Sequence, residues 1–144
     1  MILFRCFGLA MLLLMGCKST EPMLREHPLR IEYGSFGGFA GSYTMYTAVP
    51  DGQVWKQDRH QGDHNSMAPI DEAVLQQAVA ILRELRKAKY AIHQPGNMTY
   101  FVRLFEGQDV DDYELVWGNE DPDPRAKILY QSLVQLAIEQ TYTR

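Results

Sequence analysis

Four side chains of a metal-binding type lie close together in a polar segment near the middle of the chain. They are Asp58, His60, Asp63 and His64. Imidazole and carboxylate groups are ligands that zinc and other transition ions accept in proteins. Their spacing matches no established ligand pattern, however, and a polar loop accounts for the same residues without a metal. We therefore assign no metal ligand, and a metal-dependent enzyme centred on His60 and His64 stays an alternative.

Other residues that could do chemistry lack the neighbours that a catalytic role requires. The acidic run Glu120, Asp121 and Asp123 lacks the spaced ligands of a calcium loop, and carboxylates suit the start of a helix. The serines of the folded part lack a Gly-x-Ser-x-Gly context. Asp111 and Asp112 are adjacent in a predicted strand, so their side chains point to opposite faces. The sequence favours a protein that is not an enzyme and that carries no cofactor.

Length and charge narrow the class of protein further. A chain of 144 residues is long enough for one core, and its formal net charge is −4. The densest basic cluster, Arg83 to Lys89, closes a predicted helix, where cations complement the helix dipole. Because no basic face is evident that could neutralise phosphates, a nucleic-acid partner is disfavoured.

Hydrophobic periodicity predicts the elements that position these residues. Alternating or apolar runs indicate strands near residues 29–33, 42–49, 53–58, 98–105 and 113–117. A helix is predicted from Asp71 to about Lys89, and a second begins at Asp123-Pro124. The order β-β-β-α-β-β-α predicts an α+β domain, with a mostly antiparallel five-stranded sheet and both helices packed on one face. The first helix would be a crossover that places the fourth strand beside the first.

Side-chain alternation in these strands predicts which residues the helices cover. On the covered face we expect Tyr43, Met45, Tyr100, Val102, Leu115 and Trp117. The opposite face would then carry Tyr46, Trp55, Phe101, Phe105 and Val116. Large apolar groups on an open face need a cover or a partner. This face is therefore a candidate docking surface.

The most unusual stretch spans residues 31–49, which hold five aromatic residues and four glycines. We expect a hairpin with its turn near Gly34 to Gly38. Under one hypothesis the glycines only shape the turn, and Phe36 and Phe39 pack onto the sheet. Under the other, the bare backbone of Gly37 and Gly38 lets a partner approach, and Phe36 or Phe39 anchors it. The candidate partner-binding residues are Phe36, Gly37, Gly38 and Phe39.

The N-terminus has the pattern of a secretory signal. Arg5 precedes an apolar run, residues 9–15, that is too short to span a bilayer. The sequence Leu14-Met15-Gly16-Cys17 that follows resembles the lipobox of bacterial lipoproteins. The resemblance implies a signal peptide at residues 1–16, acylation of Cys17 with palmitate or a related chain, a polar tether at 17–28 and one domain at 29–144.

The same resemblance implies a location. Lipid on Cys17 would hold the protein to a membrane of the bacterial cell envelope. Lys18 and Ser19 follow the cysteine, and neither is the aspartate that favours retention at the inner membrane in many such proteins. The outer membrane is therefore expected if the source has two membranes. Cys6 would leave with the signal peptide, so no thiol would remain in the domain.

A second resemblance rests on short motifs in a fixed order: Gly37-Gly38-Phe39-Ala40-Gly41, then Pro95-Gly96-Asn97-Met98-Thr99-Tyr100-Phe101, then Val116-Trp117-Gly118. This order, with an Asp-Gly turn after the first motif, resembles small bacterial lipoproteins. The first motif, the central amphipathic helix, the entry into a strand from Pro95 to Tyr100 and the final leucine-rich helix are also distantly similar to the emfourins, which are inhibitors of thermolysin-like metallopeptidases. The lipobox and the longer histidine-containing loop depart from the emfourin pattern. The resemblance implies an α+β fold and, as an expectation, inhibition of a peptidase.

Two function hypotheses follow besides the metal-dependent enzyme. One is a non-catalytic binding module of the envelope, such as a peptidase inhibitor, that uses the glycine-rich hairpin. The other is a structural or assembly lipoprotein that docks a larger envelope partner through the open sheet face. The first predicts a protruding hairpin at Gly37 to Gly41. The second predicts that Phe101 and Phe105 are exposed.

Overall fold

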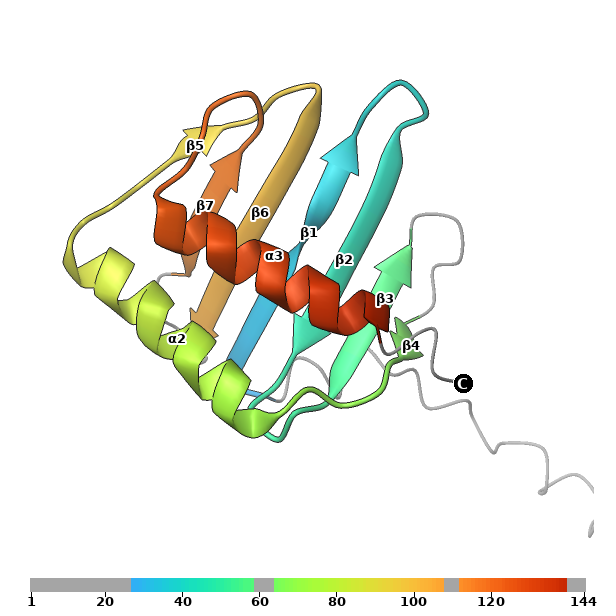
Figure 1. Cartoon of the computed structure of the whole chain (residues 1–144), viewed down its shortest axis with the longest axis vertical. Helices are drawn as coiled ribbons and strands as arrows, with labels where there is room; N and C mark the ends of the chain where they lie inside the picture. Colours follow the sequence, from blue (N-terminus) through green and yellow to red (C-terminus); the bar gives the residue numbers. More distant parts are fainter. Residues whose placement is uncertain (1–26, 59–63, 108–111, 140–144) are drawn as a thin grey trace, which may run out of the picture.

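The computed structural model describes residues 27–58, 64–107 and 112–139, which form a mixed seven-stranded sheet with both helices on one face (Figure 1). The order of the sheet is β4-β3-β2-β1-β6-β7-β5. The strands are β1 Leu29–Gly37, β2 Ser42–Ala48, β3 Val54–Asp58, β4 His64–Ser66, β5 His93–Gln94, β6 Met98–Glu106 and β7 Tyr113–Trp117. The helices are α2 Glu72–Lys87 and α3 Pro124–Glu139.

The predicted α+β class is confirmed, but the predicted count of five antiparallel strands is wrong. β4 and β5 have three and two residues, which is too short for an alternating pattern to show in the sequence. β5 also pairs parallel with β7, whereas the other strand pairs are antiparallel. The predicted crossover is present, because β1 pairs with β6 from Leu29↔Glu106 to Gly37↔Met98.

Both helices begin at residues that satisfy their first backbone N–H groups. The Asp71 carboxylate accepts a 2.7 Å hydrogen bond from the backbone N–H of Ala73 at the start of α2. The Asp123 carboxylate accepts one of 2.9 Å from the N–H of Arg125, beside Pro124 at the first helical position of α3. Each helix then buries one stripe on the sheet: Leu75, Ala78, Val79, Leu82 and Leu85 in α2, and Ala126, Leu129, Leu133 and Ala137 in α3.

The predicted covered face is correct in β6 and β7 and wrong in β2. Tyr46, expected on the open face, is buried beneath the helices, and its ring stacks on Tyr33 at 5.2 Å. Tyr46 pairs with Tyr33 across the β1–β2 ladder, so Tyr43 and Met45 belong to the other face. Every residue of β2 from Tyr43 to Tyr46 is large or β-branched, so alternation alone did not tell its two faces apart.

The hydroxyl of Tyr33 is buried without a hydrogen-bond partner among the described residues. Burial raises the pKa of this phenol far above its ordinary value. An unsatisfied buried hydroxyl costs about 1–3 kcal/mol. We therefore expect Tyr33→Phe to leave the free energy of unfolding unchanged or to raise it by about 1 kcal/mol, measured by urea unfolding with tryptophan fluorescence.

Tyr113→Phe is the matched control, because the Tyr113 hydroxyl donates a 2.8 Å hydrogen bond to the backbone oxygen of Tyr90. Its removal should lower the free energy of unfolding by about 1 kcal/mol. A loss of the same size in Tyr33→Phe would contradict the prediction, since it would mean that the Tyr33 hydroxyl has a stabilising partner.

Candidate functional site

The glycine-rich hairpin joins β1 and β2, which are neighbouring strands in the middle of the sheet. Its turn spans residues 38–41, not Gly34 to Gly38 as predicted, and β1 continues through Gly37. Gly34 lies in mid-strand opposite Met45 and Phe101. A Cβ added to Gly34 would lie 2.1 Å from the backbone oxygen of Thr44. Glycine is therefore needed there for the close approach of two strands rather than for a turn.

The turn itself uses backbone conformations that favour glycine. The φ angles of Gly37, Gly38 and Gly41 are 112°, 74° and 59°. The N–H of Gly41 donates a 3.0 Å hydrogen bond to the oxygen of Gly38, and the Ser42 hydroxyl donates one of 2.9 Å to the oxygen of Gly37. These bonds close the tip of the hairpin into one defined conformation.

A second segment braces this turn. The N–H of Gly38 donates a 2.7 Å hydrogen bond to the backbone oxygen of Asn97, in the loop that leads into β6. A Cβ added to Gly37 would lie 2.2 Å from the same oxygen. The bare backbone at Gly37 therefore serves an intramolecular contact. This role accounts for one of the two glycines that the sequence marked as candidates for partner approach.

A third segment completes the end of the sheet. A Cβ added to Gly118, after β7, would lie 2.3 Å from the backbone nitrogen of Gly96. The buried Thr99 hydroxyl donates to the oxygen of Gly96 at 3.0 Å and accepts from its N–H at 3.1 Å. We call residues 37–41, 95–97 and 118–119 the glycine end. Its three loops lie along the same end of the sheet (Figure 1), so the three sequence motifs converge there.

The two phenylalanines of the hairpin differ in their surroundings. Phe36 has a relative exposure of 40%, and its ring lies 6.2 Å from that of Phe101 on the open face of the sheet. Phe39 has a relative exposure of 109% and protrudes from the tip. The hypothesis that both rings pack onto the sheet is therefore wrong for Phe39.

The open face of the sheet is not the continuous apolar surface expected from the strand pattern. Glu32 pairs with Arg30 at 3.2 Å and with Arg103 at 3.3 Å, and Arg103 also pairs with Glu114. The Arg30 guanidinium lies 3.6 Å from the centre of the Phe105 ring and covers it. Phe101 is buried as well, with a relative exposure of 6%. Neither phenylalanine presents the bare ring that a docking site would need.

The four residues whose types could bind a metal ion form no metal site in the part of the chain that the structure describes. His60 and Asp63 lie outside the described residues, as does Asp111. Asp58 pairs with Lys56 at 2.9 Å and accepts a hydrogen bond from the Thr44 hydroxyl. Within residues 27–58, 64–107 and 112–139, no group of three or more His, Cys, Asp or Glu side chains could hold a metal ion.

The acidic run before α3 has the role expected at a helix start. Hydrogen bonds from the side chain and the backbone N–H of Arg125 lower the pKa of the Asp123 carboxyl. Asp121 pairs with Lys127 at 2.6 Å. These carboxylates therefore have partners within the helix that they precede.

The N-terminal residues 1–26, including Cys17, lie outside the described structure. In the described part of the chain, no helix is long and apolar enough to cross a membrane. No protein-family model matches the chain, and no curated protein matches it.

Proposed function

We propose that the protein is a lipid-anchored binding module of the bacterial cell envelope and that it engages a protein partner with the tip of its glycine-rich hairpin. The observation that carries the proposal is the position of Phe39, which is fully exposed on a turn braced by the loop at residues 95–97, and that loop packs in turn against Gly118. A large aromatic side chain is a frequent anchor in protein interfaces. A preorganised turn lowers the entropic cost of presenting it.

The shape of the domain suits this role. β1 has nine residues, so Leu29 and the tip lie roughly 30 Å apart at opposite ends of the strand. A lipid on Cys17 would attach through the residues that precede Leu29. The tether would then enter the domain at the end of β1 opposite the tip, with Phe39 available to a partner.

The partner class that we favour is a peptidase of the envelope. A narrow tip with one protruding ring fits a cleft better than a flat surface, and the resemblance to emfourins supports inhibition. The alternative is a structural lipoprotein that docks through the open sheet face. It has less support, since ion pairs cross that face and Arg30 covers Phe105.

Affinity capture from the protein's own membranes tests the tip directly. We expect Phe39→Ala to abolish recovery of the partner that the wild-type chain retains, because the anchor ring is lost. The free energy of unfolding should stay within about 0.5 kcal/mol of wild type, as for other exposed positions. The measurements are quantitative mass spectrometry of the captured proteins and urea unfolding of the same variant.

Ile128→Ala is the matched control, because Ile128 is another large apolar residue that is exposed, at 63%, on α3. The Ile128→Ala protein should retain as much of the partner as the wild-type chain does. Equal loss in both variants would indicate non-specific adhesion and would contradict the proposal. A loss of about 3–5 kcal/mol in Phe39→Ala would instead mean that Phe39 belongs to the core.

The lipid anchor proposed on Cys17 is tested separately. Cys17→Ser should leave an unprocessed precursor that takes up no labelled palmitate, since the modified thiol is absent. Metabolic labelling followed by gel fluorography checks this, with Cys6→Ser as a control that should be processed and labelled normally. Incorporation of label into the Cys17→Ser protein would refute the lipoprotein assignment and would leave the role of Phe39 untouched.

A further inference from the structure

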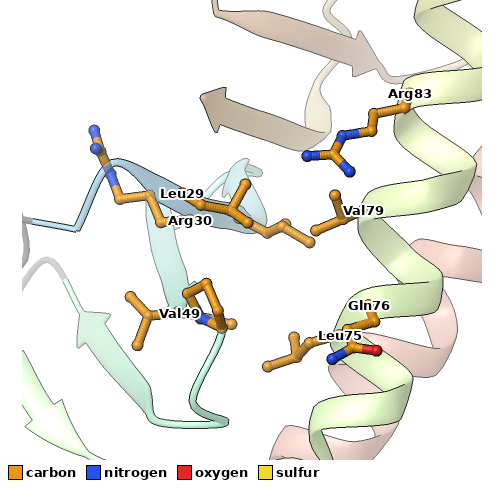
Figure 2. Close-up of a pocket in the computed structure, with 10 residues that line it drawn as sticks. Leu29, Arg30, Val49, Leu75, Gln76, Val79 and Arg83 are labelled. Atoms are coloured by element: carbon orange, nitrogen blue, oxygen red, sulfur yellow. The ribbon is translucent and has the colours of Figure 1, made fainter. Parts of the chain in front are cut away.

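A cavity of about 290 Å³ lies between α2 and the base of β1 and β2, at the end of the sheet opposite the glycine end. Most of its lining residues are apolar, including Leu29, Ile31, Val49, Pro50, Leu75 and Val79. Figure 2 shows Leu75 and Val79 of α2 facing Leu29 and Val49 across the space. No motif in the sequence pointed to this cavity, because its walls come from three separate segments.

The polar lining residues are Arg30, Gln76 and Arg83, and Arg30 pairs with Glu32 on the same strand. Gln76 and Arg83 of α2 lie beside the opening, and Arg83 lies above Val79 (Figure 2). Arg83 also lines an adjoining shallow depression together with Arg86, Lys87 and Glu106. An apolar cavity therefore meets a basic depression at one arginine.

The charges of the depression do not balance. Arg83 pairs with Glu106 at 2.6 Å, and Arg86 pairs with the other oxygen of the same carboxylate at 3.3 Å. Two guanidinium groups therefore share one carboxylate, and Lys87 adds a third cation. The result is a local excess of positive charge on a chain whose formal net charge is −4. This excess favours an anionic group beside the mouth of the cavity.

We propose that the cavity binds a fatty acid, with its alkyl chain among Leu75, Val79 and Val49 and its carboxylate on Arg83 and Arg86. An apolar cavity of ~150 Å³ holds benzene, so at the same space per carbon 290 Å³ accommodates roughly ten to twelve carbons. Charge-assisted hydrogen bonds from the guanidinium N–H groups of Arg83 and Arg86 that do not contact Glu106 would fix the head group. This site is independent of the tip and of the function proposed for it.

The probe is dodecanoate with a diazirine at the chain end, added to the full-length protein in phosphatidylcholine vesicles. Photolysis should label peptides that contain Leu75–Val79 or Leu29–Ile31 in a saturable way, read by mass spectrometry. Unlabelled dodecanoate should compete at least tenfold better than dodecanol, because only the acid pairs with the arginines.

Two neighbouring glutamines provide the decisive variants. Gln76 and Gln77 are both exposed on α2, and only Gln76 lines the cavity. We expect Gln76→Trp to cover the mouth and to reduce labelling at least tenfold, whereas Gln77→Trp should label like wild type. Equal labelling of the two variants would overturn the proposal, as would labelling that does not saturate.

A second pair of variants tests the head group while leaving the apolar residues of the cavity unchanged. Arg83→Gln combined with Arg86→Gln should weaken competition by dodecanoate at least fivefold. Arg125→Gln is the control, because Arg125 is as exposed as Arg83, at 50%, and also pairs with one carboxylate. The carboxylate site is wrong if dodecanol competes with the probe on the wild-type chain as well as dodecanoate does. It is also wrong if dodecanoate competes on the double variant as well as it does on wild type. Near-UV circular dichroism confirms that each variant is folded.

Discussion

Gly118→Ala is expected to lower the free energy of unfolding by about 1–3 kcal/mol and to abolish partner capture. The added Cβ would lie 2.3 Å from the backbone nitrogen and 2.5 Å from the Cα of Gly96, and 3.0 Å from the oxygen of Met98. All three are backbone atoms, so no change of rotamer relieves the clash. The loop at residues 95–97 must move, and the Asn97 oxygen that holds Gly38 moves with it.

Gln131→Ala is the control for this prediction, because Gln131 is exposed on α3, outside the glycine end. Its free energy of unfolding should stay within about 0.5 kcal/mol of wild type. Urea unfolding and capture are measured on both variants. A Gly118→Ala protein with wild-type stability and capture would show that the brace between the loops does not hold the tip.

Leu82→Ala is expected to lower the free energy of unfolding by about 2–5 kcal/mol. Leu82 is completely buried in the middle of α2, within the cluster that joins both helices to the sheet. Truncation removes three carbons from a packed core and leaves a space that the rigid sheet cannot close. Small domains are stable by only about 5–15 kcal/mol, so this single change removes a large share of the total.

Gln77→Ala, on the exposed side of the same helix, is the matched control and should change stability by less than about 0.5 kcal/mol. Leu133→Ala tests the equivalent position in α3, which is also completely buried, and should give a loss of similar size. A loss below about 1 kcal/mol in Leu82→Ala would contradict the single core shared by α2 and α3.

The helices and the long strands could be predicted from the sequence because their causes are local. Asp71 caps the helix that follows it, and Pro124 fits the first position of the next helix. The buried stripes of both helices repeat at steps of three and four residues, which is a property of the chain alone. The crossover that places β6 beside β1 follows from the length and position of α2.

The candidate site could be predicted only in part. The types of residue were visible, since Phe36 to Phe39 combine paired glycines with two aromatic rings. The position of the turn could not be predicted from the sequence, because nothing in the sequence separates the role of Gly34 from that of Gly38. Their roles differ only once Thr44 lies against Gly34 and Asn97 lies against Gly37 and Gly38.

The sequence by itself determined the class of fold, the two helices with their caps and the residues from which the hairpin tip is built. Tertiary structure alone decided which face of β2 is buried, because apolar residues on both sides of a strand leave its orientation to strand pairing. It also decided that Phe36 leans on Phe101 while Phe39 projects freely. The same holds for the cavity beside α2, whose walls are brought together from three distant segments by packing rather than by any local pattern.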